Sequence, residues 1–333
     1  MTSDILHIVL GIIANSEGSI LIAKRSTDTP QGGLWEFPGG KVEHDEDPKS
    51  ALIRELREEL GIEVMYARPL IKFPYNYPEQ KILFDVWKIY KWYGEANGRE
   101  GQLIDWVPVS SLSKKKFPAA NKNIITSIQL PSLYLIIPDL SGKIDDYIMR
   151  IEACLESGVR LLQLRCGEKL IRDSSFVACV LDLCNSYNAE LLLNSEPENA
   201  VKYNAHGVHL SSARLLQMSH RPLDSSYWVA ASCHDQKELI HACHLGVDFI
   251  VCSPVKRTTS HPEAKPLGWK KFLRFAEIAT VPIYALGGMY PRHLSIAWEY
   301  GAQGVALLSS VWQANDPAEI IRDCIKGNPV NVI

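Results

Sequence analysis

The second part of the chain repeats one pattern eight times, and this repetition constrains the fold more than any other feature. A short apolar run recurs, and in most cases a segment with helical periodicity follows it before the next run begins. The predicted helices include residues 144–157, 174–187, 236–245, 269–279 and 291–300. Fully buried parallel strands have this continuous apolar character, and helical crossovers join them. The sequence therefore predicts an α/β domain that closes as a (β/α)8 TIM barrel. The expected strands are residues 133–137, 160–165, 190–194, 207–210, 228–233, 249–253, 282–286 and 304–309.

Polar residues gather where these predicted strands end, which is where barrels of this kind place their sites. Glycines and serines follow the last two strands, where backbone N–H groups commonly bind phosphate. We therefore expect a site for a phosphorylated small molecule at this end of the barrel. The alternative is that the glycines only form turns and the small residues only pack. The candidate ligand-binding residues are Gln163, Arg165, His234, Gly288, Ser309 and Ser310.

The first part of the chain has a different organisation. Predicted strands at 5–13, 19–23, 63–73, 81–92 and 103–108 surround a helix that begins near Pro48 and ends at Gly61. Proline favours the first turn of a helix, and glycine favours the position just after its end. This order predicts an α+β domain with a mixed sheet between helices. A short polar stretch before Pro131 marks the boundary, so we expect one domain over 1–130 and another over 131–333.

The helix of the first domain carries three glutamates at Glu55, Glu58 and Glu59. Positions i, i+3 and i+4 share one helix face, so these carboxylates crowd together. The plain interpretation is a solvated acidic face in which Arg54 pairs with Glu58. The functional interpretation is a site for a hard divalent cation, Mg²⁺ or Mn²⁺, which takes carboxylate oxygens and retains positions for water and phosphate.

The spacing of these residues decides between the two interpretations. From Gly40 to Ile62 the chain fits the Nudix box, G-x5-E-x7-R-E-U-x-E-E-x-G-U with U apolar, at every fixed position. Residues 11–13, 34–41, 98–102 and 117–121 extend the match. Over residues 5–128 the chain resembles the MutT-type Nudix hydrolases. The resemblance implies the Nudix fold and Mg²⁺-dependent hydrolysis of an oxidised purine nucleoside triphosphate, 8-oxo-dGTP, to the monophosphate and pyrophosphate.

The resemblance also implies roles for individual residues. The family's metal ligands fall on the Gly39 carbonyl and on Glu55, Glu58, Glu59 and Glu100. The catalytic base is one of Glu55, Glu58 and Glu100, and the sequence does not choose among them.

Base recognition falls on Arg25, Phe37 and Asn121. An amide that accepts a hydrogen bond from N7–H of an 8-oxo purine would select the oxidised base. The alternative for Asn121 is a helix N-cap. An arginine that closes over the nucleotide in the family is Gln80 here.

The barrel carries a second resemblance. Residues 163–165, 206–210, 253–255 and 286–289 look like those of the thiamine-phosphate synthase/TenI superfamily, over about 132–315. The synthase's lysine falls on Cys166, and its two magnesium-binding aspartates fall on Ser195 and Arg214. We therefore do not expect synthase activity. His234 matches the catalytic histidine of the TenI branch, a thiazole tautomerase, and could shuttle a proton near neutral pH.

Charge and composition limit the partners. The formal net charge is −3, without the basic excess of a polymeric nucleic-acid binder. We expect no signal peptide and no membrane span, because no apolar run reaches about 18 residues. All eight cysteines lie beyond residue 150 and are expected to be reduced thiols in a cytoplasmic protein.

Three hypotheses follow from these features. In the first, nucleotide sanitation by the Nudix domain prevents mutation and is the working activity. In the second, the barrel is a thiamine-pathway enzyme, a thiazole tautomerase or a synthase. In the third, the barrel is a non-catalytic phosphate-ligand-binding module that regulates the Nudix domain.

Overall fold

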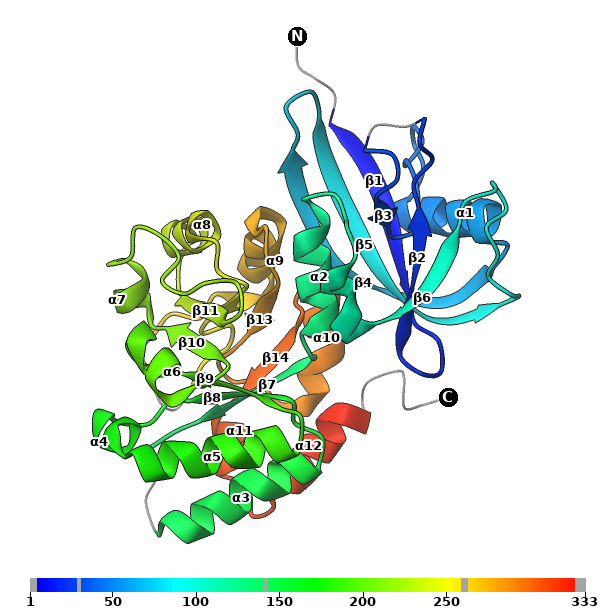
Figure 1. The fold of residues 1–333 in the computed structure, drawn as a ribbon. Helices are drawn as coiled ribbons and strands as arrows, with labels where there is room; N and C mark the ends of the chain where they lie inside the picture. Colours follow the sequence, from blue (N-terminus) through cyan, green and yellow to red (C-terminus); the bar gives the residue numbers. More distant parts are fainter. Residues whose placement is uncertain (1–4, 29–30, 140–142, 259–262, 327–333) are drawn as a thin grey trace. The chain divides into compact units, whose positions relative to one another are not determined.

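The computed structural model describes residues 5–28, 31–139, 143–258 and 263–326. The chain divides into two compact units, Met1–Gln129 and Leu130–Ile333 (Figure 1). Each unit has its own hydrophobic clusters, and the two are described separately below.

The first unit contains two three-stranded sheets. In one, β1 pairs with β5 in parallel and β4 pairs with β5 antiparallel, so this sheet is mixed, as predicted. In the other, β2 pairs antiparallel with both β3 and β6. The strands are β1 (Leu6–Ile13), β2 (Ser19–Lys24), β3 (Trp35–Glu36), β4 (Glu63–Asn76), β5 (Lys81–Tyr93) and β6 (Ile104–Pro108). The helices are α1 (Pro48–Leu60), the 3-10 helix η1 (Val109–Lys114) and α2 (Asn121–Gln129).

Two separate hydrophobic clusters hold this unit together. Leu52, Leu56 and Leu60 of α1 pack in one cluster with alternate residues of β1, including Val9 and Ile13. Leu10 and Ile12 of β1 belong to the other cluster, which also contains Ile124 of α2. Because side chains alternate along a strand, β1 contributes to both clusters. The loop after β3 and helix α1 therefore both lie against β1.

The second unit is a closed barrel of eight parallel strands. The chain order is kept around the barrel, and it closes where β14 pairs with β7, with Val305 opposite Leu133. The strands are β7 (Leu133–Ile137), β8 (Leu161–Leu164), β9 (Glu190–Leu193), β10 (Gly207–Leu210), β11 (Trp228–Cys233), β12 (Phe249–Cys252), β13 (Ile283–Ala285) and β14 (Gly304–Leu307). All eight coincide with predicted strands, with ends that differ by no more than two residues.

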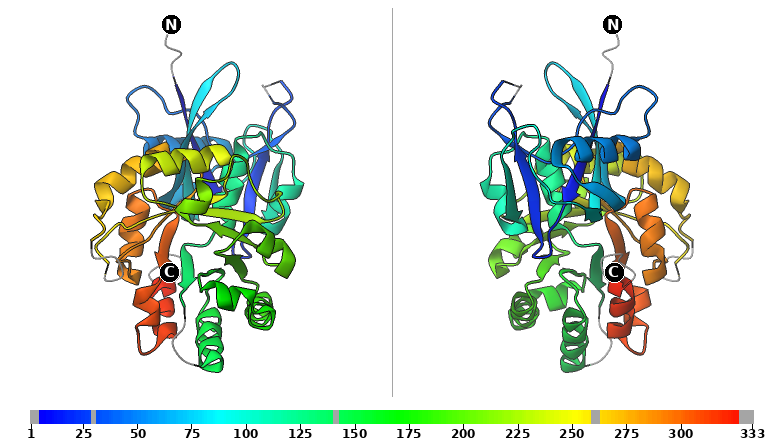
Figure 2. Two further views of the ribbon diagram at one scale, coloured as in Figure 1. Left: turned by 90° about the vertical axis from the view of Figure 1, so that its left-hand side faces the viewer. Right: turned by 90° about the vertical axis from the view of Figure 1, so that its right-hand side faces the viewer.

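Helices surround these strands, as the two side views of Figure 2 show by their green to red ribbons. Five of the helices were predicted in outline. They are α3 (Ile144–Glu156), α5 (Ser174–Ser186), α8 (Gln236–Leu245), α9 (Gly268–Ile278) and α10 (Leu294–Glu299), which follows the 3-10 turn η2 (Pro291–His293). Five others were not predicted: α4 (Glu168–Arg172), α6 (Pro197–Tyr203), α7 (Ser212–Leu215), α11 (Ser309–Trp312) and α12 (Pro317–Lys326).

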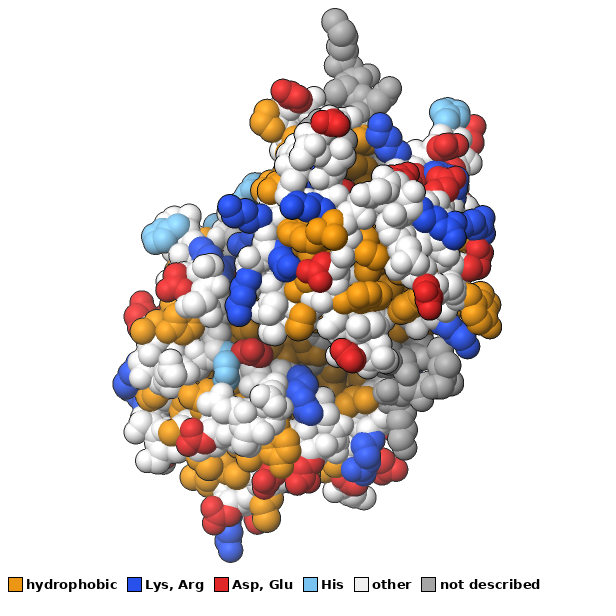
Figure 3. Space-filling view, turned by 45° about the vertical axis from the view of Figure 1, so that its right-hand side comes forward, with side chains coloured by type: hydrophobic (Ala, Val, Ile, Leu, Met, Phe, Trp, Pro, Cys, Tyr) orange, Lys and Arg blue, Asp and Glu red, His pale blue; other side chains and the backbone are white. Residues whose placement is uncertain are grey.

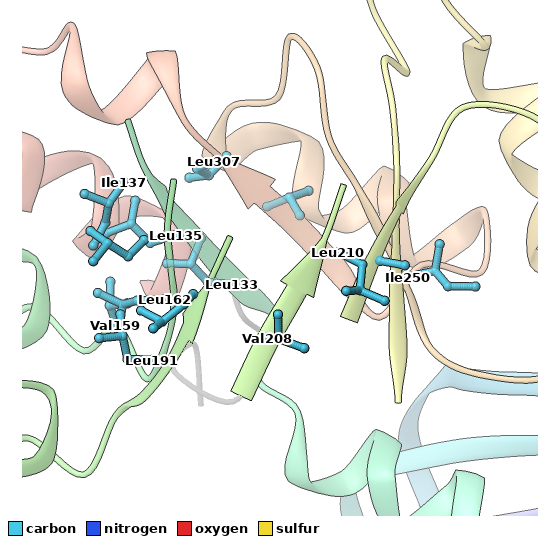
Figure 4. Close-up of a cluster of buried hydrophobic side chains, with 14 of the residues drawn as sticks. Leu133, Leu135, Ile137, Val159, Leu162, Leu191, Val208, Leu210, Ile250 and Leu307 are labelled. Carbon is cyan, nitrogen blue, oxygen red and sulfur yellow. The ribbon is translucent and has the colours of Figure 1, made fainter. Parts of the chain in front are cut away.

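Side chains of each barrel strand alternate between two clusters. Leu133, Leu135 and Ile137 of β7 lie in the large cluster between strands and helices, part of which Figure 4 shows. Tyr134 and Ile136 lie in the smaller cluster that fills the barrel interior. The interior is therefore a packed core, and a ligand has room only at the end of the barrel.

All eight cysteines are free thiols, as expected. Within the described ranges, no helix is both long and apolar enough to cross a bilayer. On the face shown in Figure 3, lysine and arginine side chains are interspersed with aspartates and glutamates.

Candidate functional sites

Helix α1 is fixed at both ends by residues that its sequence supplies. The Asp47 carboxylate accepts hydrogen bonds from two N–H groups of the first turn at 3.1 Å, and Pro48 occupies the first turn. Gly61 ends the helix with φ of 73°, a left-handed conformation that glycine adopts without strain. The leucines that hold the inner face of the helix are completely buried: Leu52, Leu56 and Leu60. The glutamates are therefore held on the remaining faces.

Arg54 organises the carboxylates of this region. Its guanidinium donates two hydrogen bonds to Glu46, at 3.0 and 2.9 Å, and one to Glu55 at 2.8 Å. It also donates to Glu58 at 3.3 Å, which is the i,i+4 pair considered above, and to the Lys41 carbonyl at 3.0 Å. A fork of five donors suits such a multiple contact, which lysine could not make. Arg54 thereby fixes the positions of Glu46 and Glu55 relative to the glycine loop.

The glycine loop lies against both β1 and α1. The Val9 N–H donates to the Gly40 carbonyl at 2.9 Å, which attaches the loop to β1. A Cβ atom on Gly39 would lie 2.1 Å from the Val9 carbonyl oxygen, and one on Gly40 would lie 2.3 Å from the Glu55 carboxyl carbon. The Gly39 N–H donates to Glu59 at 3.0 Å. Only glycine allows this approach, which brings two glutamates of α1 against the loop.

Glu59 lies in an acidic environment. Burial is the largest cause that raises its pKa, from the ordinary value of 4.5 to about 8. The hydrogen bond from Gly39 acts in the opposite direction, and the negative charges of Glu36, Glu100 and Glu55 raise the pKa further. Near neutral pH the carboxyl is therefore mostly protonated unless a cation compensates its charge.

The donor chemistry of this cluster fits a hard divalent cation, which prefers carboxylate and carbonyl oxygens. The cluster is acidic, and burial and the neighbouring carboxylates destabilise the ionised form of Glu59. In the described part of the chain, no three such side chains already converge as a complete coordination set. Glu55 and Glu59 lie against the loop, whereas Glu58 is 58% exposed and Glu100 is exposed on the turn after β5. The fit therefore rests on the chemistry of the donors and on the loop.

The three residues expected to recognise a base lie in or beside one hydrophobic cluster. Phe37 is 1% exposed and stacks on Phe117, with ring centroids 5.3 Å apart. Arg25 forms an ion pair with Glu36, a partner that the sequence did not indicate. Asn121 is 4% exposed and is the first residue of α2. Within the described ranges, no protein group forms a hydrogen bond with its side-chain amide, so it makes no N-cap contact there.

Tyr77 is a residue of this region that the sequence did not single out. Burial raises the pKa of its hydroxyl, while hydrogen bonds with the Gln31 side chain and the Ala120 backbone act in the opposite direction, as does the charge of Arg25. These influences place Tyr77 between Arg25 and the start of α2. Its N–H donates to the Gln80 carbonyl at 2.9 Å, so Gln80 belongs to the turn that carries Tyr77.

The barrel has a cavity of about 390 Å³ at the carboxyl ends of its strands. Five of the six predicted ligand-binding residues line it: Gln163, Arg165, His234, Gly288 and Ser309. Ser310 is the sixth, and it is not among the described residues that line the cavity. Its Oγ is buried and has no hydrogen-bond partner in the described structure. The prediction placed Ser310 in the site because it follows a strand, but Ser310 is the second residue of α11 and its hydroxyl is buried.

No acidic side chain is among the described residues that line this cavity. The nearby carboxylates are already engaged. Glu238 accepts hydrogen bonds from the His234 N–H at 2.6 Å and from the Ser212 hydroxyl at 2.5 Å. Glu196 accepts from Arg214 at 2.6 Å. The charged groups that face the cavity are therefore basic.

The ring of His234 is oriented by the backbone of the neighbouring strand. Its Nδ1 lies 2.8 Å from the Ser253 carbonyl oxygen. A carbonyl can only accept, so Nδ1 carries the hydrogen and the neutral ring keeps Nε2 as an acceptor. The side chain is exposed at the cavity, so this nitrogen is available to a ligand.

The protein thus has a cluster of carboxylates beside a glycine loop in one unit and a ligand-sized cavity at the end of a barrel in the other. The NUDIX domain model matches residues 9–127, and the thiamine monophosphate synthase model matches residues 133–311. The chain therefore belongs to the Nudix hydrolases through its first unit and to the thiamine monophosphate synthase family through its second.

Individual relatives agree with this assignment. The chain is 37% identical to the 8-oxo-dGTP diphosphatase of Escherichia coli over 124 residues, which is 37% of this chain and 96% of that protein. It is 29% identical to the thiamine-phosphate synthase of Thioalkalivibrio sulfidiphilus over 195 residues, which is 58% of this chain and 92% of that protein. The thiamine phosphate pyrophosphorylase of Pyrococcus furiosus superposes with a TM-score of 0.50 at 20% identity, over 64% of this chain and 99% of that one, and so shows a shared fold.

Proposed function

We propose that the Nudix unit hydrolyses 8-oxo-dGTP to 8-oxo-dGMP and pyrophosphate, and thereby removes an oxidised precursor from the nucleotide pool. The observation that carries this proposal is Asn121, which is 4% exposed and whose side-chain amide forms no hydrogen bond within the described structure. The donor and the acceptor of this amide are therefore free to pair with the edge of a base, and an ordered amide in this position would give specificity for the base that matches it. Two relatives of this unit, from Escherichia coli and Haemophilus influenzae, are named 8-oxo-dGTP diphosphatase.

The chemistry requires Mg²⁺, with Mn²⁺ as a substitute. Bound Mg²⁺ would neutralise phosphate charge and lower the pKa of a water molecule. The Gly39 carbonyl with Glu55, Glu58, Glu59 and Glu100 would hold it. Arg54 keeps Glu55 in place, and Glu59, whose pKa is raised to about 8, would give up its proton to serve as a ligand.

In the reaction itself, water attacks the β-phosphorus and the bond from that phosphorus to the α,β-bridging oxygen breaks. One of Glu55, Glu58 and Glu100 takes the proton of the attacking water. Glu55 is directly oriented by Arg54 beside the glycine loop, which favours it for this role. Arg25, Phe37 and Asn121 would bind the base, with the amide of Asn121 accepting from N7–H of the 8-oxo purine.

The test is pyrophosphate release from 8-oxo-dGTP and dGTP, measured side by side with Mg²⁺. We expect strong preference for 8-oxo-dGTP, and Asn121→Ala should lower that preference by about tenfold or more. The matched control is Asn123→Ala, which alters the same residue type on the same helix. Equal turnover of dGTP and 8-oxo-dGTP by the unmodified chain would refute the substrate assignment.

A second candidate function is ligand binding by the barrel, and the cavity at the end of its strands supports this function. We propose that the barrel binds a phosphorylated small molecule through Arg165, the glycines Gly287 and Gly288, and Ser309. His234 could move a proton on that ligand, as in a tautomerase. Thiamine-phosphate synthesis is not proposed, because Ser195 and Arg214 replace the expected carboxylates. Isomerisation of a thiazole phosphate, lost in His234→Ala but not in Glu58→Gln, would assign the working activity to the barrel instead.

A further inference from the structure

A chain of polar residues runs beneath the cavity of the barrel. Its inner members are buried, with Tyr134 and His209 at 0% and Gln163 at 2% exposure. Each side chain contacts the next by a hydrogen bond, and three of the members, Asn194, Gln163 and Ser232, line the cavity. In order from the outside, the members are Arg214, Asn194, Gln163, Tyr134, His209 and Ser232. We call this set the relay.

The outer half of the relay has a fixed direction. Arg214 donates to Asn194 Oδ1 at 3.3 Å, and a guanidinium has no acceptor. The amide of Asn194 must then donate through its nitrogen, to Gln163 Oε1 at 3.2 Å. By the same logic, Gln163 donates to the Tyr134 hydroxyl at 3.2 Å. The orientation of both amides thus follows from the arginine at the start.

The direction continues through the inner half. The Tyr134 hydroxyl accepts from Gln163, so its own hydrogen goes to His209 Nδ1, 3.1 Å away. Burial, and secondarily the charge of Arg165, lowers the pKa of His209 to about 3, so the imidazole is neutral and has one N–H. That hydrogen lies on Nε2 and is donated to Ser232 Oγ at 2.8 Å. The hydroxyl hydrogen of Ser232 is left to point at the cavity.

Without Arg214 the relay could run in either direction. Both amides could turn over, Tyr134 could donate to Gln163, and His209 could take its other tautomer. Ser232 would then donate inward and offer the cavity only lone pairs. Arg214 excludes this second state because it can donate but not accept. The residue acts on the cavity from outside it, since it is not among the lining residues.

We propose that the barrel cavity binds a small organic anion without a divalent cation. In this proposal the relay orients the Ser232 hydroxyl so that it donates a hydrogen bond to an acceptor atom of that ligand. The lining supports the first part, because Arg165 and His234 face the cavity and none of its described lining residues is acidic. The inference rests on the barrel part of the proposed function and is independent of the nucleotide chemistry.

The direction of the relay can be measured without a ligand. In the full chain labelled with ¹⁵N-histidine, two-bond ¹H–¹⁵N spectra distinguish protonated from unprotonated ring nitrogens, and His209→Asn assigns the signal. We expect His209 with a bare Nδ1 and a protonated Nε2. Arg214→Met should introduce the opposite tautomer, and Arg214→Lys should restore the original one because lysine is also only a donor. A protonated Nδ1 in the unmodified chain, or no change in Arg214→Met, would overturn the relay.

The ligand is tested with inorganic phosphate in excess EDTA, which also removes metal from the Nudix unit. We expect saturable shifts of the His234 and His209 signals, with affinity that Ser232→Ala weakens by about tenfold. The control Ser175→Ala alters an exposed serine of the same unit and should bind as the unmodified chain does. No shift without Mg²⁺ would refute the anion site together with the barrel part of the proposed function. If Ser232→Ala binds phosphate as tightly as the unmodified chain does, the role of Ser232 is refuted while the anion site stands.

Discussion

Replacing Glu59 with glutamine should stabilise the metal-free Nudix unit while abolishing its activity. Glutamine keeps an oxygen that can accept from the Gly39 N–H, so the hydrogen bond at 3.0 Å survives. It removes the carboxyl whose pKa burial and the neighbouring glutamates raise to about 8. The change therefore separates the charge of Glu59 from its contact with the glycine loop.

The sign and size follow from proton linkage. Between pH 4.5 and 8 the unfolded chain loses the Glu59 proton while the folded unit keeps it, so stability falls as pH rises. Each pKa unit corresponds to about 1.4 kcal/mol, so at pH 7 the loss relative to pH 4.5 is about 3 kcal/mol. Above pH 8 both states are ionised and the loss stops growing. Saturating Mg²⁺ should recover this free energy because a cation compensates the carboxylate.

Hydrogen exchange of peptides from residues 9–127 in EDTA, at pH values from 5 to 8, isolates the opening free energy of this unit from that of the barrel. We expect Glu59→Gln to flatten the pH dependence of the opening free energy. At pH 7 its opening free energy should be higher than that of the unmodified protein. Glu58→Gln is the matched control, since this neighbouring glutamate of α1 is 58% exposed. Parallel pH profiles for Glu59→Gln and the unmodified chain would refute the reasoning.

Three further changes address the same unit. Arg54→Lys should lower kcat/KM for 8-oxo-dGTP by about a hundredfold, because one ammonium cannot hold both Glu46 and Glu55; retained activity would show that the fork is dispensable. Gly40→Ala should lower kcat by a similar factor of about a hundred, since its Cβ would displace the Glu55 carboxylate, and steady-state kinetics with circular dichroism as the folding control checks this. Tyr77→Phe should raise KM about threefold with little change in kcat, and an unchanged KM would place the hydroxyl outside the site.

The barrel strands were predictable because each is a short, continuously apolar segment that burial on both sides requires. The run at 207–210 and the strand β10 are identical for this reason. The short helices α6 and α7 were missed because seven and four residues are too few to show a helical period. Ser310 was placed in the site from its position after a strand, but the turn of α11 directs its hydroxyl into the protein.

The site of the first unit was predictable where function fixes residue types at fixed spacing. Glu46 is one of the fixed positions of the Nudix box, yet its double contact with Arg54 depends on a loop conformation that spacing alone does not reveal. The partner of Arg25 could not be found, since Glu36 comes close only through the pairing of β2 with β3. The relay was hidden for a related reason, because its members come from four strands, the end of β9 and helix α7, which meet only in the closed barrel.

That closure also imposes an order on synthesis. The strand β7 leaves the ribosome first among the barrel strands, yet one of its edges stays unpaired until β14, at Gly304–Leu307, has been made. All pairings of the Nudix unit, by contrast, involve residues before 109. Domains generally fold as units, the N-terminal one first. During translation the nucleotide-hydrolysing part can therefore be complete while the barrel is still an open sheet with two exposed edges, so a ribosome that stalls late would release an active hydrolase attached to an aggregation-prone fragment.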